Sequence, residues 1–264
     1  MKRAAIAFIG LGRMGRPMAA RLVAAGYPLR VHDKASRVRL PGATSCASPA
    51  EVASGARVLV TMLPDGKTVR SALLGRSGAA SALAAGSIVI DMSSADPVAT
   101  RALGAELSRR GIELLDAPVS GRVDGARAGT LTIMAGGKAA TLRKVRPVLE
   151  ALGKETFLAG PLGAGHAVKA LNNYIAAAGT IAAFEAVIVG RAFGLDPALM
   201  TDIFNPSAGR NSTTLNKVRQ HVLSGEFASG LALALMAKDV GIATRFPEEP
   251  KFYTCQRFAG AVDD

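Results

Sequence analysis

The chain has 264 residues, 49% of them apolar, which suits one large folded domain or two smaller ones and excludes a disordered chain. Its formal net charge is +12, but the Lys and Arg residues are scattered and accompany only nine Phe and three Tyr. Nucleic-acid sites gather basic and aromatic residues, so we expect no nucleic-acid partner.

The cysteines and the apolar segments bear on the compartment. Cys46 and Cys255 lie far apart without metal-ligand spacing, which favours two free thiols in a reducing compartment, the cytoplasm, and no metal. The apolar start is interrupted by Arg13, so we expect no export. The apolar stretch 174–190 carries Glu185 and is short for a bilayer, so we expect a buried or interface helix and no membrane partner.

Short apolar runs predict strands, and helical patterns fall between several of them. The predicted strands are Ala4–Ile9, Leu29–Asp33, Val58–Met62, Ser87–Met92, Glu113–Ala117 and Leu131–Ala135, and the predicted helices include Met14–Ala25, Pro97–Arg110 and Ala139–Leu149. This alternation indicates crossover units and therefore an α/β fold with a doubly wound, mostly parallel sheet. From Val168 onward the apolar periodicity is helical, which predicts a second, all-helical domain.

The glycines of "GLGRMG" (residues 10–15) directly follow the first predicted strand and open the first predicted helix. Gly10 permits a tight turn, Gly12 lets the backbone approach a pyrophosphate, and Gly15 lets the helix pack closely on the strand. The N–H groups of the helix N-terminus would then face the phosphates. Strand, glycines and helix together predict a dinucleotide-binding site.

Asp33 ends the second predicted strand, eighteen residues after Gly15, where a carboxylate can accept the ribose hydroxyls. A carboxylate there repels a 2′-phosphate and favours NAD, whereas Lys34 and Arg37 partly offset that repulsion and keep NADP open. We therefore expect a Rossmann-type dinucleotide-binding domain over residues 1–162. A helical substrate and oligomerisation domain follows over residues 163–264.

Further segments in the same order carry a resemblance to a known family. They are "TMLP" at 61–64, "DMSSADP" at 91–97, "DAPVSGRVDGARAGTLTIMAGG" at 116–137, "GPLGAGHAVKALNN" at 160–173 and "MAKDVGIA" at 236–243. With the glycine segment, they make the chain resemble the β-hydroxyacid dehydrogenases over about residues 4–243, and it is similar to 3-hydroxyisobutyrate dehydrogenases. The resemblance implies an NAD(P)-dependent oxidoreductase with a helical domain like that of 6-phosphogluconate dehydrogenase.

The resemblance also implies roles for individual residues. Lys169 is expected to be the catalytic acid/base, and Asn173, on the same helix face, to orient the substrate. Burial beside cations such as Lys238 is expected to lower the pKa of this lysine toward the working pH. The implied cofactor-binding residues are Gly10, Leu11, Gly12, Arg13, Met14, Gly15, Asp33, Leu63, Pro64, Ser94 and Lys238.

The implied substrate loop contains Ser120 and Gly121, which match the positions that bind the substrate carboxylate. Arg122 stands where the family usually has a glycine, and it either narrows the pocket or adds a cation for a second anionic group. His166 lies one turn before Lys169 and is a competing general base. We expect it to be structural, because the lysine already supplies the proton chemistry.

The leading interpretation is an NAD-dependent dehydrogenase of short 3-hydroxy acids. The alternatives are an NADPH-dependent reductase of glyoxylate or succinic semialdehyde, or a non-catalytic dinucleotide-binding module. Family members form dimers or tetramers, and the apolar helix 175–189 is the expected contact. The last segment, 244–264, departs from the family pattern and holds two prolines, so we expect it to be irregular or only briefly helical.

Overall fold

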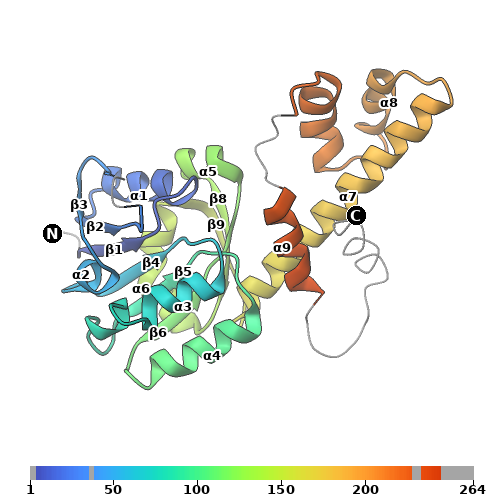
Figure 1. The fold of residues 1–264 in the computed structure, drawn as a ribbon. Helices are drawn as coiled ribbons and strands as arrows, with labels where there is room; N and C mark the ends of the chain where they lie inside the picture. Colours follow the sequence, from blue (N-terminus) through green and yellow to red (C-terminus); the bar gives the residue numbers. More distant parts are fainter. Residues whose placement is uncertain (1–3, 36–38, 228–232, 245–264) are drawn as a thin grey trace. The chain divides into compact units, whose positions relative to one another are not determined.

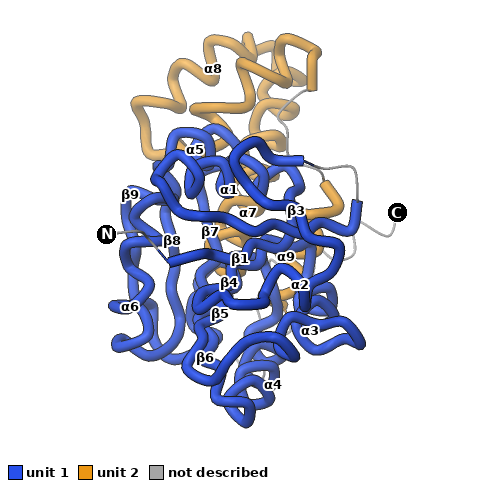
Figure 2. Tube along the Cα trace, turned by 90° about the vertical axis from the view of Figure 1, so that its left-hand side faces the viewer, with its two compact units in different colours: residues 1–169 blue, residues 170–264 orange. Residues whose placement is uncertain are grey.

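The computed structural model describes residues 4–35, 39–227 and 233–244 (Figure 1). The chain divides into two compact units, Met1–Lys169 and Ala170–Asp264 (Figure 2). The first unit is an α/β sheet domain, and the described residues of the second are helical. The expectation for the final segment falls, apart from Thr244, outside the described residues.

The first unit contains nine strands and six α-helices within the described residues. The strands are β1 (Ile6–Ile9), β2 (Leu29–His32), β3 (Ala43–Ser45), β4 (Val58–Thr61), β5 (Ile88–Asp91), β6 (Glu113–Asp116), β7 (Val119–Ser120), β8 (Leu131–Gly136) and β9 (Gly153–Gly160). The helices are α1 (Gly15–Ala24), α2 (Pro49–Ala53), α3 (Gly66–Leu74), α4 (Pro97–Ser108), α5 (Arg122–Ala128) and α6 (Ala139–Glu150), with a 3₁₀ turn at Ala79–Ser81.

The strands form one sheet in the order β3-β2-β1-β4-β5-β6-β8-β7, and β9 pairs with β8. The pairs from β3 to β6 are parallel, whereas β8 runs antiparallel to β6 and β7. Figure 1 shows this sheet with helices on both sides. The structure confirms the predicted doubly wound, mostly parallel sheet followed by helices.

Alternate residues of the central strands enter two separate cores. On one face Phe8 and Ile90 pack with residues of α1 and α6 such as Leu22 and Val145. On the other face, strand residues such as Ile9 and Val89 pack with residues of α2, α3 and α4. These helix residues include Val52, Leu73 and Leu107. A strand buried on both faces reads as a continuous apolar run, which is why these strands were predictable.

The strands that were not predicted, β3, β7 and β9, lack such runs, and two of the three residues of β3 are exposed. Most residues of β9 are exposed, and its sequence GKETFLAG shows no apolar alternation. The strand β7 has two residues and exists through its pairing with β8, in which Val119 faces Ile133. Both strands depend on neighbours that are distant in sequence, so local patterns do not reveal them.

The second unit contains most of α7 (Ala164–Ala192), then α8 (Pro197–Phe204), a π-helix (Thr214–Leu223) and α9 (Leu233–Ala243). By length and composition alone, α7 is apolar enough to cross a membrane. Its buried Ala177 instead packs against Val240 of α9, with Tyr174 and Met236 beside them. This is the packing of a helix within a folded unit.

Candidate active site

The parallel strands β1, β4, β5 and β6 end side by side at one edge of the sheet. Their last residues Ile9, Thr61, Asp91 and Asp116 are in register. Ligands of open α/β sheets bind beyond this carboxyl edge. The loops that leave it carry most of the predicted cofactor-binding residues, including the glycine loop at 10–15. Asp33 instead follows β2, and Lys238 lies on α9.

The three glycines of this loop are needed for different reasons. Gly10 has φ +99°, and a Cβ on it would collide with the carbonyl oxygen of Met62, while a Cβ on Gly15 would collide with the carbonyl oxygen of Gly10. These two glycines are required by the packing of the chain itself. A Cβ on Gly12 would meet no atom of the described residues within 4 Å. Protein packing does not require a glycine there, whereas the close approach of a pyrophosphate does.

The N-terminus of α1 is suited to an anion. Within the described residues, no side chain caps it and its first turn contains no acid. The exposed Arg13 and Arg16 lie beside it. Free N–H groups and the positive end of the helix dipole bind phosphate. With the open position at Gly12, these residues fit the pyrophosphate of a dinucleotide.

Asp33 follows β2 and has a second role that the sequence did not indicate. Its Oδ2 accepts a 2.6 Å hydrogen bond from the backbone N–H of Leu11, and its Oδ1 accepts one of 2.8 Å from Ala35. The carboxylate therefore holds the glycine loop against the end of β2. Lys34 beside it is exposed, and Arg37 lies outside the described residues.

The loops after β4 and β5 are joined by Ser93, next to the predicted Ser94. The Ser93 hydroxyl accepts a 3.0 Å hydrogen bond from the N–H of Leu63, and its own N–H donates to Asp91 Oδ1 at 3.1 Å. The same carboxylate oxygen accepts the hydroxyl of Thr61 at 2.9 Å. Ser93 is buried, whereas Ser94 is half-buried and Pro64 exposed. Ser93 therefore fixes the backbone on which the predicted cofactor residues lie.

The first turn of α7 is attached to the same edge of the sheet by Asp116. Its Oδ1 accepts the N–H of Gly163 and its Oδ2 accepts the N–H of His166, both at 2.7 Å. Burial raises the pKa of Asp116 above its ordinary value of 3.8, and the His166 imidazole and the two N–H groups oppose that rise. This carboxylate caps α7 through Gly163, which lies 47 residues later in the sequence.

His166 is enclosed by hydrogen bonds. Its side chain has no exposed surface, its Nδ1 lies 2.8 Å from the Thr100 hydroxyl, and its Nε2 lies 3.0 Å from the carbonyl oxygen of Ser93. A carbonyl oxygen only accepts, so Nε2 carries a proton. Asp91 and Asp116 flank the ring at 3.8 and 3.9 Å. These contacts support the structural role expected for this histidine.

Lys169 and Asn173 lie one turn apart on α7, and both are half-buried. The Asn173 amide donates a 2.6 Å hydrogen bond to Asp239 Oδ2 on α9. Asp239 Oδ1 lies 3.0 Å from the ammonium of Lys238. Asp239 thus links two predicted site residues but was itself not predicted, although a charge within the apolar sequence LALMAKDVGIA was a usable signal.

The predicted substrate loop surrounds the end of β7. Ser120 is half-buried and pairs with Thr132 of β8. Gly121 has φ +136° and Arg122 has φ +60°, so two successive residues adopt conformations that favour glycine. A non-glycine residue in the left-handed region costs about 1 kcal/mol or more and is retained mostly at functional sites.

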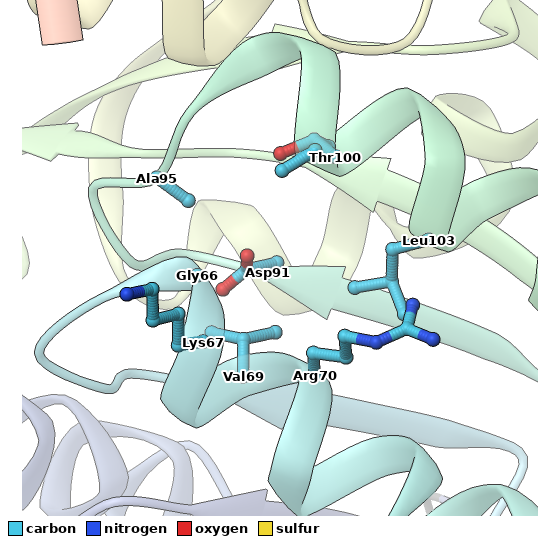
Figure 3. A pocket seen from close by; sticks show the side chains of 9 residues that line it. Gly66, Lys67, Val69, Arg70, Asp91, Ala95, Thr100 and Leu103 are labelled. Atoms are coloured by element: carbon cyan, nitrogen blue, oxygen red, sulfur yellow. The ribbon is translucent and has the colours of Figure 1, made fainter.

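A cavity of about 100 Å³ lies between α3 and α4 (Figure 3). Its lining includes Lys67 of α3, Asp91 at the end of β5 and Thr100 of α4. The volume holds several water molecules but is too small for a dinucleotide. The cavity reaches the buried Asp91 and does not by itself accommodate the cofactor.

The chain matches family models over most of its length. Residues 5–160 match the NAD binding domain of 6-phosphogluconate dehydrogenase. Residues 163–255 match the model described as NAD-binding of NADP-dependent 3-hydroxyisobutyrate dehydrogenase. Both descriptions name a nicotinamide dinucleotide, which agrees with the fit of the glycine loop and of Asp33.

Individual relatives agree with these models. The chain is 38% identical to a 2-(hydroxymethyl)glutarate dehydrogenase of Eubacterium barkeri, over 92% of this chain and 82% of the relative. It is 39% identical to an NAD-dependent L-serine dehydrogenase of Pseudomonas aeruginosa, over 90% of this chain and 83% of the relative. A solved structure of the Mycobacterium tuberculosis 3-hydroxyisobutyrate dehydrogenase with L-serine matches with a TM-score of 0.82 and 33% identity. The match covers 99% of this chain and 88% of that chain.

These relatives act on small hydroxy acids, which sets aside the non-catalytic binding module. The carboxyl-edge loops, the glycine loop and the first turn of α7 provide a site of the matching kind. The chain therefore belongs to the β-hydroxyacid dehydrogenase family and is an NAD(P)-dependent oxidoreductase of short hydroxy acids.

Proposed function

We propose that the enzyme oxidises a short 3-hydroxy acid to its semialdehyde, with NAD as the preferred cofactor and Lys169 as the acid/base. The position of Lys169 carries this proposal. It lies three residues after His166, whose backbone is bonded to Asp116 at the carboxyl edge of the sheet. The glycine loop leaves the same edge, so the lysine follows directly on the element held beside the cofactor loops.

The proposed chemistry needs one proton acceptor from the protein. NAD(P), when bound, accepts a hydride from the carbon that carries the hydroxyl. The neutral amine of Lys169 takes the hydroxyl proton as that C–H bond breaks, and in the reverse direction its ammonium returns the proton to the carbonyl oxygen. Asn173 orients the substrate from the next turn, with its amide held by Asp239.

Ser120 and the backbone N–H groups around Gly121 are proposed to hold the substrate carboxylate. This contact positions the reacting carbon, which is a contribution to catalysis that needs no metal. Arg122 adds a permanent cation on the same loop, which supports a substrate with a second anionic group. The glutarate relative acts on a compound with two carboxylates, in line with that proposal.

The preference for NAD rests on Asp33. Its carboxylate lies at the end of β2, hydrogen-bonded to Leu11, where the ribose of a dinucleotide is held in this fold. A negative charge at that position accepts ribose hydroxyls and repels a 2′-phosphate.

Initial rates with NAD and with NADP test the proposal, using 3-hydroxyisobutyrate, L-serine and 2-(hydroxymethyl)glutarate as substrates. We expect Lys169→Ala to lower kcat by at least about 100-fold while NADH affinity stays close to that of the parent enzyme. Lys154→Ala, at an exposed position of β9, is the control and keeps full activity. Wild-type turnover in the Lys169 variant contradicts the acid/base role. Turnover confined to NADPH with glyoxylate or succinic semialdehyde supports the reductase instead.

The assembly and the compartment complete the proposal. Ile175, Ile188 and Val189 of α7 are 67–70% exposed within the described residues, which supports a homodimer or homotetramer that covers them. Cys46 is a buried free thiol, which supports the cytoplasm as the compartment. Light scattering of the purified protein measures the assembly directly.

A further inference from the structure

We propose that Asp116 and His166 form a positioning clamp that sets the place of Lys169 relative to the cofactor loops. The clamp consists of the Asp116 carboxylate, the His166 imidazole, and the Thr100 and Ser93 groups that contact the imidazole. Its members are buried, and in this proposal they act through Lys169 rather than by contact with the substrate or the cofactor. The inference rests on the proposed acid/base role of that lysine.

Asp116 fixes the start of α7. A helix leaves its first N–H groups without partners, and a side chain at the position before the helix usually accepts them. Here that position is Gly163, which has no side chain, so Asp116 from β6 accepts the N–H of Gly163 and of His166 instead. The cap is therefore supplied across the fold, and it ties the helix to a strand end.

The first turn of α7 also approaches the sheet too closely to shift. A Cβ on Gly165 would collide with the carbonyl oxygen of Met134 in β8. A Cβ on Gly136 would collide with Asp116 Oδ1. The two glycines permit a backbone contact that leaves one position for the helix, so displacement of Asp116 displaces the turn that leads to Lys169.

His166 connects this turn to the cofactor loops. Its Nε2–H donates to the carbonyl oxygen of Ser93, whose hydroxyl accepts the N–H of Leu63. Leu63 and the neighbouring Ser94 are among the predicted cofactor residues. One buried ring thus joins the helix that carries Lys169 to the backbone of the cofactor loops. Coupled hydride and proton transfer require that these two elements keep a fixed relative position.

Two substitutions at His166 separate positioning from bulk packing. His166→Leu removes both hydrogen bonds, whereas His166→Gln keeps an N–H that can donate to the Ser93 carbonyl. We expect kcat to fall roughly 100-fold in the leucine variant, the scale of a misplaced catalytic group, and no more than about tenfold in the glutamine variant. NADH affinity, measured by fluorescence titration, should change less than about threefold in both.

The two acids of β6 provide a matched pair. Asp116→Asn removes the charged cap at one end of the strand, and Glu113→Gln removes a charge at the other end, where Glu113 contacts Thr141 and Lys144. We expect the first variant to lose roughly 10-fold to 100-fold in kcat and the second to keep its activity. Thr100→Val, which removes the Nδ1 partner together with the hydrogen bond from the Thr100 hydroxyl to the carbonyl oxygen of Asp96, is the milder variant should His166→Leu fail to fold.

A double variant shows whether the clamp acts through the lysine. Because coupled residues are not additive, adding His166→Leu to Lys169→Ala should lower kcat no further. A normal kcat in His166→Leu beside an inactive Lys169→Ala overturns the clamp and leaves the proposed function standing. A further loss in the double variant, or equal losses in the leucine and glutamine variants, also overturns it. Wild-type turnover in Lys169→Ala overturns the proposed function itself.

Discussion

The backbone N–H of Leu11 donates a 2.6 Å hydrogen bond to the carboxylate of Asp33, so one acid both supports the glycine loop and faces the expected ribose site. The bond joins the loop after β1 to the end of β2. A charged acceptor of this kind contributes about 1.5–3 kcal/mol. Substitution of Asp33 is therefore expected to affect both the choice of cofactor and the order of the loop.

The isosteric change Asp33→Asn separates these two effects. An amide keeps an oxygen that can accept the N–H of Leu11 but loses the charge that repels a 2′-phosphate. We expect the ratio of kcat/KM for NAD over NADP to fall roughly tenfold, equivalent to about 1.4 kcal/mol. Asp33→Ala, which also removes the acceptor, should weaken both cofactors. A wild-type enzyme that already prefers NADP shows that the cofactor proposal is wrong.

Arg122→Gly is expected to stabilise the protein and to change its specificity. Glycine adopts the φ of +60° without strain, so the free energy of unfolding should rise by about 1 kcal/mol. The loss of the guanidinium should raise KM for 2-(hydroxymethyl)glutarate more than KM for 3-hydroxyisobutyrate. Arg127→Ala, an exposed arginine in the last turn of the same helix, is the control. Equal KM changes for both substrates argue against a second anion site.

Asp239→Asn should reduce catalysis by weakening the hydrogen bond that holds the Asn173 amide. The Asp239 carboxylate, 16% exposed, holds the Asn173 amide and pairs with Lys238, and an asparagine loses the charge that serves both. We expect kcat to fall about tenfold, the equivalent of about 1.4 kcal/mol. Asp202→Asn breaks the exposed pair with Arg219 in the same unit and should leave kcat unchanged. Steady-state kinetics of the two variants decide, and equal kcat values contradict the role of Asp239.

The two acids of β6 should respond to pH in opposite directions. Burial raises the pKa of Asp116 above 3.8, so the folded protein binds a proton more strongly than the unfolded chain. Its contribution to stability is present below pH 3.8 and is lost as pH rises through the raised pKa. Hydrogen bonds from Lys144 and Thr141 lower the pKa of Glu113 below 4.5, so its contribution is present above pH 4.5 and is lost as pH falls through the lowered pKa.

Urea unfolding of the wild type, Asp116→Asn and Glu113→Gln from pH 3 to pH 8 tests these signs. The excess stability of the wild type over Asp116→Asn should decrease as pH rises through the acidic range. Its excess over Glu113→Gln should increase over the same range. Two differences with the same slope show that one of the two pKa directions is mistaken.

Local sequence was sufficient for much of the fold and part of the site. Strands such as β4 and β5 were predictable because both of their faces are buried, which leaves a continuous apolar run. Gly10 and Gly15 indicate the strand-to-helix turn because a side chain at either position would collide with nearby backbone. The spacing of Lys169 and Asn173 follows from the helix repeat alone. In each case the information lies within a few residues of the chain.

Tertiary structure decided which groups hold those residues in place. Asp116 and His166 are 50 residues apart, and Asn173 and Asp239 are 66 apart. Ser93 matters through its contacts with Leu63 and His166, which no pattern around Ser93 reveals. The residues proposed to bind could be recognised in the sequence, because chemistry and local geometry select them. Their supports became visible only with the strand order, because a long-range hydrogen bond depends on which elements the topology brings side by side.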